Sequence, residues 1–241
     1  MATKLTTQES AHEAAVKQMF AGIAKRYDLL NHVLSLNIDK SWRRRVRAEV
    51  KELLDNRGSV VLDVACGTGD LSLELKRDAK GSVIGTDFCR PMLSVAMDKT
   101  STEDASIPYL EADAMTLPFA DGVFDAVTIA FGLRNLPNHL AGLKELCRVL
   151  KKGGKLVILE FSKPRLPVFR ELYAFYFSTI LPRIGGLVSG SLRAYQYLPD
   201  SASKFPDQKA LAVTMEECGF SGVRFENLTG GIAAIHSGTK A

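Results

Sequence analysis

Features typical of secreted, membrane-spanning and zinc-binding proteins are missing from this sequence. Its four cysteines are scattered, with no CxxC pair and no histidine at metal-ligand spacing, so neither a zinc site nor a disulfide framework is expected. No run of about 18 apolar residues is present to form a membrane-spanning helix. The first 20 residues lack the basic flank and apolar stretch of a secretory signal. We therefore expect a cytoplasmic protein without a bound metal.

An excess of charge of one sign is also missing. Lys and Arg number 31 and Asp and Glu 27, so the formal net charge is only +4, which is little for an obligate nucleic-acid-binding protein. With 46% apolar and 24% charged residues, the composition is that of a globular chain. We expect no nucleic-acid partner, and the 241 residues fit one large domain.

Short apolar runs alternate with helical patterns along most of the chain. Strands are expected at residues 60–64, 82–86, 107–111, 124–130 and 155–161, with helices between them at 91–98 and 140–150. This alternation predicts a mostly parallel sheet covered by helices on both faces. Helical spacing also marks residues 16–27 and 39–54, ahead of the sheet.

The C-terminal end departs from this alternation. A helix at 208–218 is followed by strands at 222–228 and 231–236, which are joined through Thr229 and Gly230. This spacing predicts a β-hairpin, and so an antiparallel edge on the parallel sheet.

The strongest chemical signal is LDVACGTGD, residues 62–70, between an expected strand and helix. Glycines in such a turn let the backbone approach a nucleotide-like ligand at the carboxyl end of a strand. The residue after Gly69 is the acidic Asp70, which would repel a pyrophosphate at the helix N-terminus. S-adenosylmethionine has no phosphate and carries ammonium and sulfonium cations, so the turn favours a methyl donor over NAD.

Three aspartates at the strand ends support a methyl donor. Asp87 lies 18 positions after Gly69, where a carboxylate accepts hydrogen bonds from both ribose hydroxyls, and Asp113 can accept one from the adenine amine. Asp63, inside the first strand, either ties the backbone of the turn or orients the donor's ammonium group. Each of Asp70, Asp87 and Asp113 alone is equally common as a turn or cap residue, but these three carboxylates at successive strand ends, together with the glycine turn, favour a donor site.

Longer motifs in the same order give a more specific indication. The sequence closely resembles the ubiquinone/menaquinone biosynthesis C-methyltransferases (the UbiE/MenG family) from about Tyr27 to Lys240. LDVACGTGD and ADAMTLPF are shared with many class I methyltransferases, whereas GLRN, LEFSKP and LTGGIAAIHSG are typical of this family. The family pattern has glycine where Asn37 stands.

The resemblance implies an α/β fold of the class I S-adenosylmethionine-dependent methyltransferases (Rossmann-like), with a mostly parallel seven-stranded sheet and a C-terminal antiparallel hairpin edge. We expect one domain, divided into an N-terminal helical cover (1–57), a donor-binding core (58–163), a helical substrate-side insertion (164–206) and a C-terminal helix and hairpin (207–241). The expected donor-binding residues are Asp63, Gly67, Thr68, Gly69, Asp87, Asp113, Ala114 and Ala130.

The implied reaction is methyl transfer from S-adenosylmethionine to a ring carbon of a prenylated quinol. The substrate in the family is demethylmenaquinol, which becomes menaquinol, and in some members also the 2-polyprenyl-6-methoxy-benzoquinol precursor of ubiquinone. Two alternatives stay open, namely a methyltransferase for another lipid or small molecule and a non-catalytic protein that keeps the donor fold.

Carbon methylation requires that the quinol lose a phenolic proton. Arg134 and Asn135 follow the fourth expected strand, and we expect Arg134 to stabilise the phenolate or orient a water while Asn135 holds a ring oxygen. The alternative is that Arg134 pairs with a structural carboxylate. Arginine is too basic, with a pKa above about 12, to be the base itself. Other candidates are Tyr195, Tyr197 and His236, although His236 fits a buried core position equally well.

Three further segments are expected on the substrate side. Tyr27 and Asn31 are expected in a lid over the donor, and the aromatic stretch 169–187, with the N-terminal helices, is expected to line the site of the prenyl tail. The basic run 42–47 is either a solvated helix face or a contact with anionic lipid head groups. A peripheral position at the membrane and a homo-oligomer are both compatible with the sequence.

Overall fold

The fold is a seven-stranded sheet with strand order β3-β2-β1-β4-β5-β7-β6. The computed structural model describes residues 7–28, 32, 35, 37–103, 105–162, 164 and 192–241. Neighbouring strands are parallel except β7, which is antiparallel to both β5 and β6. This confirms the expected parallel sheet with an antiparallel hairpin edge. The strands are β1 (Val60–Val64), β2 (Ser82–Asp87), β3 (Tyr109–Glu111), β4 (Phe124–Ala130), β5 (Leu150–Phe161), β6 (Phe220–Leu228) and β7 (Ala233–Lys240).

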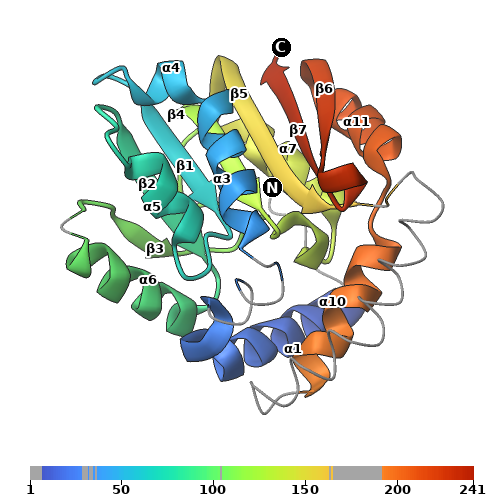
Figure 1. The fold of residues 1–241 in the computed structure, drawn as a ribbon. Coiled ribbons are helices and arrows are strands. Elements are labelled where there is room, and N and C mark those ends of the chain that lie inside the picture. Colours follow the sequence, from blue (N-terminus) through green and yellow to red (C-terminus); the bar gives the residue numbers. More distant parts are fainter. Residues whose placement is uncertain are drawn as a thin grey trace.

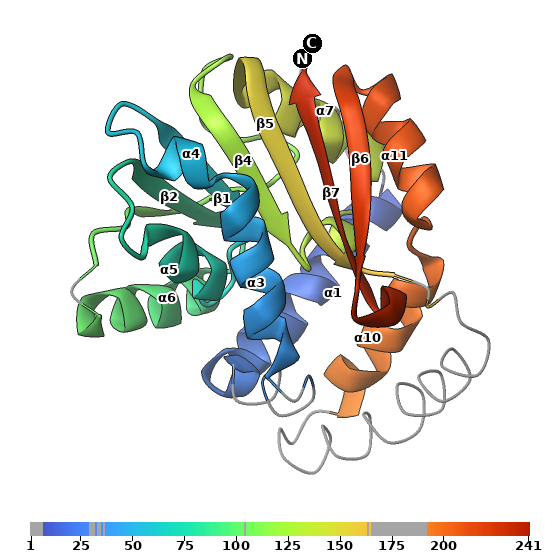
Figure 2. The same ribbon diagram turned by 45° about the horizontal axis from the view of Figure 1, so that its top comes forward.

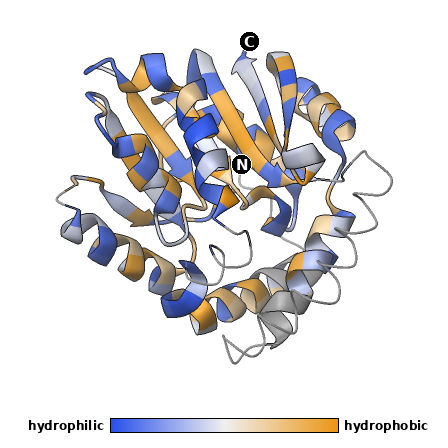
Figure 3. Ribbon diagram, in the orientation of Figure 1, coloured by the Kyte–Doolittle hydropathy of each residue, from blue (hydrophilic) through white to orange (hydrophobic). Residues whose placement is uncertain are grey.

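Helices cover both faces of the sheet (Figure 1). On one face Val61 and Val157 pack among apolar residues of α3, α4 and α5, and on the other Leu62 and Leu156 pack against α7 and α11. Strands that are buried on both sides are mainly apolar, and Figure 3 shows orange along much of β1 and β5. The helices are α3 (Ile38–Glu49), α4 (Lys51–Leu54), α5 (Asp70–Lys76), α6 (Arg90–Thr102), α7 (His139–Val149) and α11 (Gln208–Glu217).

Two helices that are distant in sequence meet beyond the carboxyl ends of the strands (Figures 1 and 2). α1 (Thr7–Ile23), which continues into the short helix η1 (Ala24–Arg26), contacts α10 (Leu192–Lys204). Ligands bind at this edge in open α/β sheets. Of the helices in the described residues, none combines the length and the apolar character needed to cross a membrane.

Several observed elements differ in their bounds from the expected ones, and three of these differences have a local cause. The helix expected at 39–54 is divided at Val50, whose φ is −114°. β5 begins at Leu150, because this residue already pairs with Phe124 before a shift of register. β7 begins only at Ala233, because residues Thr229–Gly231 form a 3-10 turn (η4).

Asn37 sits at the start of α3 with a left-handed backbone, at φ 61°. Glycine adopts this conformation without strain, and asparagine is among the few other residues that tolerate it. The departure from the family pattern is therefore compatible with the same backbone.

Gly85 in β2 is required by close packing, which leads to a prediction about stability. A Cβ atom at this position would lie 2.5 and 2.6 Å from ring carbons of Tyr109. We expect Gly85→Ala to lower the free energy of unfolding by about 1–3 kcal/mol in urea denaturation. The control is Gly22→Ala in α1, where nothing lies within 4 Å, and which should raise stability by up to about 1 kcal/mol. Equal effects of the two substitutions would contradict this explanation.

Candidate active site

The glycine turn between β1 and α5 has a backbone that few residues could adopt. Gly67 and Gly69 have φ values of 57° and 81°. A Cβ on Gly69 would also lie 2.7 Å from the Tyr109 hydroxyl. The turn is held from the next strand, because Asp87 Oδ2 accepts a hydrogen bond from the Gly67 N–H at 2.8 Å. The turn therefore presents its backbone to the space beyond the sheet.

One cavity at this edge collects most of the expected donor-binding residues. Its lining includes seven of the eight: Asp63, Gly67, Thr68, Asp87, Asp113, Ala114 and Ala130. Gly69 is the exception, and its contribution is to the shape of the turn. Phe20 and Tyr27, from the N-terminal segment, close the same cavity on the other side. We call this space the donor cavity.

Asp63 is a buried carboxyl at the floor of the donor cavity. Its side chain accepts hydrogen bonds from Ser72 at 2.6 Å and from Thr128 at 3.0 Å. Burial raises its pKa to about 7, and these two hydrogen bonds oppose the rise only in part. A carboxyl of this kind ionises readily when a cation is placed beside it.

Asp87 is the last residue of β2, and Asp113 follows the last residue of β3 by two positions. Burial raises the pKa of Asp87 to about 6, against the hydrogen bonds that it accepts from the backbone of Cys89 and Gly67. Asp113 accepts a hydrogen bond from the Met115 N–H at 2.8 Å, as a turn aspartate does, while it also lines the donor cavity. The structural and donor-binding interpretations of these residues are thus compatible.

Arg134 pairs with a carboxylate that the sequence interpretation did not identify. Its Nη1 lies 2.9 and 3.1 Å from the two carboxylate oxygens of Glu160, and both side chains are at least 95% buried. Burial raises the pKa of Glu160, and the charge of Arg134 opposes this rise. Among the described residues, Arg134 Nε has no hydrogen-bond partner. Nη1 therefore anchors the guanidinium to Glu160, and Nε is a buried donor without a partner among these residues.

Asn135 joins the donor cavity to helix α10. Its amide nitrogen donates to the Phe131 carbonyl at 3.2 Å, and its amide oxygen accepts a hydrogen bond from the Tyr197 hydroxyl at 3.1 Å. Tyr197 is thereby brought to the site together with Asn135. Tyr195 belongs to the same helix, but its side chain lies outside the described residues.

His236 is located away from this site. It is 2% exposed in β7, and its Nε2–H donates to the Gln208 carbonyl at 2.9 Å. Burial lowers its pKa, which favours the neutral ring, and Nε2–H is already committed to the Gln208 carbonyl. It lines neither the donor cavity nor the cavity described below. The structure thus favours the core interpretation of His236, and we do not retain it as a candidate base.

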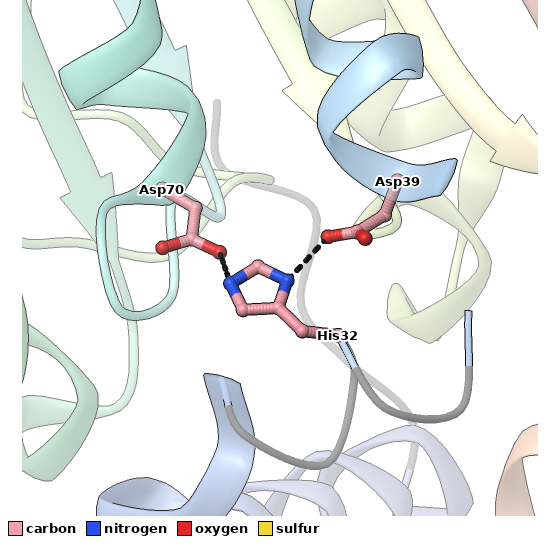
Figure 4. A group of neighbouring side chains, drawn as sticks. All are labelled: His32, Asp39 and Asp70. Carbon is pink, nitrogen blue, oxygen red and sulfur yellow. Dashed lines mark hydrogen bonds and ion pairs between the residues drawn. The ribbon is translucent and has the colours of Figure 1, made fainter. Parts of the chain in front are cut away.

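A group of charged residues ties the N-terminal segment to the glycine turn. Figure 4 shows His32 between Asp39 and Asp70, with its Nδ1 2.8 Å from Asp39 and its Nε2 3.6 Å from Asp70. The three are close enough to share a metal ion. However, Arg43 already bonds both carboxylates, at 2.6 and 3.0 Å, so we interpret the group as an ion-pair cluster.

Lys99 extends this cluster to the end of the N-terminal helix. Its ammonium group bonds Asp70 and lies 2.8 Å from Asp28, which also accepts a hydrogen bond from Thr68. Although burial acts to raise it, the pKa of Asp70 is lowered by Arg43 and Lys99. Asp70 therefore stays ionised and links three segments around the entrance of the donor cavity. Asn31, expected in the lid, lies outside the described residues.

Comparison with known proteins identifies the family. Residues 7–240 match the ubiE/COQ5 methyltransferase family. The chain belongs to this family. It is 50% identical over 223 residues to the demethylmenaquinone methyltransferase of Thermus thermophilus, covering 92% of this chain and 100% of the relative. It is 48% identical over 229 residues to a ubiquinone/menaquinone biosynthesis C-methyltransferase UbiE of a Geobacter species, covering 93% and 96% of the two chains. The protein is therefore an S-adenosylmethionine-dependent methyltransferase.

Solved structures agree at the level of the fold. An S-adenosylmethionine-dependent methyltransferase from Thermotoga maritima has a TM-score of 0.64 at 18% identity, covering 92% of this chain and 100% of that one. The [4+2]-cyclase SpnF has a TM-score of 0.62 at 20% identity, covering 82% and 80%. Because a cyclase shares the fold, the fold by itself does not determine the reaction.

The site contains residues that sequence interpretation missed, chiefly Glu160, Asp28 and Lys99. Glu160 carried a usable signal, since it is a carboxylate inside an apolar strand, like Asp63. Asp28 and Lys99 carried none, because their roles depend on how α1 packs beside α6.

The raised pKa of Asp63 leads to a prediction about pH and stability. Because its pKa is about 7 in the fold, against an ordinary 3.8, the folded state holds this proton more tightly than the unfolded chain. The stabilisation is complete below pH 4 and is lost as the pH rises through 7. We expect Asp63→Asn to gain stability relative to the parent by up to about 4 kcal/mol between pH 4 and pH 8. Urea denaturation without donor measures this.

The contrasting variant is Asp70→Asn, because the pKa of Asp70 is lowered in the fold. Its loss of stability should be present at pH 7 and should vanish as the pH falls below the ordinary value for aspartate. If both variants show the same dependence on pH, the assignment of the buried proton to Asp63 is wrong.

The ion-pair cluster predicts how firmly the N-terminal segment is held. Lys99→Met leaves Asp28 and Asp70 without a shared cation, so amide hydrogen exchange at residues 24–28 should become about 5- to 30-fold faster. The control is Lys17→Met in α1, which removes an exposed pair with Glu111 and should change little. Unchanged exchange in Lys99→Met would exclude this role.

Proposed function

We propose that this enzyme methylates a ring carbon of a prenylated quinol and converts demethylmenaquinol to menaquinol. The observation that carries the proposal is that two chemically different regions adjoin at this edge of the sheet. Buried carboxyls line the donor cavity, and Arg134 and Asn135 stand where that cavity meets α10. Relatives named for demethylmenaquinone methylation, which are 50% identical in Thermus thermophilus and 44% identical in Staphylococcus aureus, support this acceptor.

A second acceptor is the 2-polyprenyl-6-methoxy-benzoquinol precursor of ubiquinone. The relative from the Geobacter species is named for both ubiquinone and menaquinone biosynthesis at 48% identity. The two quinols share the prenyl tail and the phenolic oxygens, so the same site chemistry serves both.

The carboxyls of the donor cavity fit a cationic donor. Burial raises the pKa of both Asp63 and Asp87, and the charges of Arg43 and Lys17 oppose this rise only in part. We assign Asp63 to the ammonium group, Asp87 to the ribose hydroxyls and Asp113 to the adenine amine. S-adenosylmethionine supplies the methyl group when bound. Thr68 and the backbone of the turn complete the contact, and Ala114 and Ala130 leave room for the adenosine.

Arg134 is assigned to the phenolate of the acceptor. Glu160 holds Nη1 of the guanidinium at 2.9 Å, and Nε is a buried donor without a partner among the described residues. We assign this guanidinium to the oxygen that becomes negative. A fixed cation in a buried position stabilises such charge strongly. This lowers the pKa of the quinol, so the proton can pass to water without a strong base. Asn135, positioned by Tyr197, holds a ring oxygen.

We further propose that the enzyme meets its acceptor at the membrane surface, because a polyprenyl quinol resides there. The basic run 42–47 contributes little to this contact. Arg43 is buried in the ion-pair cluster, and Arg45 bonds Glu226 at 2.6 Å. Trp42, also buried, donates a hydrogen bond to Thr229 at 2.9 Å. The run serves mainly to attach α3 to the body of the protein.

The experiment is a methyl-transfer assay with S-adenosylmethionine carrying a labelled methyl group. Demethylmenaquinol and the benzoquinol precursor are supplied separately in reduced form. Label in menaquinol supports the main proposal, and label only in the benzoquinone product supports the second acceptor. Binding of the donor without transfer to either quinol would sink the proposal and leave another substrate or a non-catalytic protein.

The role of Arg134 predicts a loss of turnover without a loss of donor binding. Arg134→Lys keeps a cation beside Glu160 and so avoids an unpaired buried carboxylate, but it lacks the fork that reaches the phenolate. We expect kcat to fall about 100-fold, the scale for losing one transition-state donor. The dissociation constant of S-adenosylmethionine, measured by calorimetry, should stay within about twofold. Near-normal turnover with intact donor binding would show the assignment to be wrong.

A further inference from the structure

A second cavity of about 460 Å³ lies between α1, α10 and the short helix η2 (Leu133–Asn135). Its size falls within the roughly 300–1,000 Å³ of pockets that bury small ligands. Val16 and Met19 of α1 line one side, and Tyr197 and Phe205 line the other. We call it the α1–α10 cavity.

This cavity adjoins the donor cavity through neighbouring residues. Arg134 lines the α1–α10 cavity, and the next residue, Asn135, lines the donor cavity. Tyr197 lines the α1–α10 cavity and donates its hydroxyl hydrogen to Asn135 at 3.1 Å. A ring held at Arg134 and Asn135 would therefore direct a substituent into the α1–α10 cavity.

The wall of this cavity changes from apolar to charged toward the solvent. Val16 and Phe205 are 3% and 4% exposed, and the His139 ring packs edge-on against Phe205. Asp200 and Lys204 also line the cavity, but they pair with each other at 2.8 Å, with side chains 56% and 72% exposed. Asp200 and Lys204 therefore form the outer rim and neutralise one another. Arg134, the charged residue at the inner end, is paired with Glu160. Between these two ends, Val16, Met19 and Phe205 offer an apolar wall that suits an uncharged apolar chain.

We propose that the α1–α10 cavity binds the first isoprene units of the acceptor's prenyl tail, while the quinol ring stays at Arg134 and Asn135. This inference rests on the proposed function and adds the location of the tail. It assigns that location to α1 and α10. The sequence predicted the N-terminal helices, to which α1 belongs, together with the stretch 169–187, which lies outside the described residues. Longer tails leave the protein past the rim formed by Asp200 and Lys204.

The test narrows the cavity without disturbing the core. Ala15 is exposed at the mouth of the α1–α10 cavity, and Met19 lies further along the same helix. Ala15→Trp and Met19→Trp are compared with Ala11→Trp, an exposed alanine one turn earlier that does not line the cavity. Each variant is assayed with demethylmenaquinol carrying several isoprene units and with the same naphthoquinol lacking the tail.

The quantity measured is the ratio of kcat/KM for the prenylated quinol to kcat/KM for the tail-less quinol. We expect this ratio to fall at least 10-fold in Ala15→Trp and in Met19→Trp and to keep the parent value in Ala11→Trp. Turnover of the tail-less quinol by each variant reports that it is folded. An unchanged ratio in both cavity variants overturns the inference and leaves the proposed function intact. Failure of the parent enzyme to methylate either quinol instead overturns the proposed function.

Discussion

The ligand edge of this protein depends on carboxyl groups buried beside a left-handed glycine turn. Asp87 bonds the backbone of the turn, and Asp63 lies beneath it with hydrogen bonds from Ser72 and Thr128. Burying a carboxyl destabilises its charged form, as the raised pKa values of both residues indicate. The two carboxyls thus hold their protons more tightly than free aspartate does, and a cation placed beside them would favour their ionised form. Burial of these carboxyls lowers the stability of the unliganded enzyme, and binding of a cationic donor offsets part of this loss.

Three positively charged side chains at this edge, in contrast, are each paired with a carboxylate. Arg43 and Lys99 both pair with Asp70, which lines the donor cavity, and Arg134 pairs with Glu160 at the proposed acceptor site. Paired charges add little net stability once their desolvation is counted, but they strongly disfavour arrangements in which one partner is left alone. These pairs therefore specify the geometry of the site. These three cations are among the 31 Lys and Arg residues of a chain whose formal net charge is only +4.

Local signals account for the parts of the structure that could be predicted from the sequence. The bounds of β1 and β4 coincide with the apolar runs, because a strand buried on both faces tolerates only such residues. The aspartates converge because parallel strands end at one edge. The pairing of Arg134 with Glu160, 26 residues apart, and the break at Val50 depend on tertiary packing, which periodicity does not encode. His236 illustrates the same limit, since an apolar strand position does not reveal which cavity is near.

Helix α1 lines both the donor cavity and the α1–α10 cavity. Phe20, near its end, lines the donor cavity, and Val16, one turn earlier, lines the α1–α10 cavity. A change in the position of this one helix alters both spaces at once. Thermodynamic linkage requires that the effect be reciprocal. If the donor changes the affinity for the acceptor by some factor, the acceptor changes the affinity for the donor by the same factor. Coupling between the two cavities, where it occurs, has a direct physical route through α1, because this helix lines both of them.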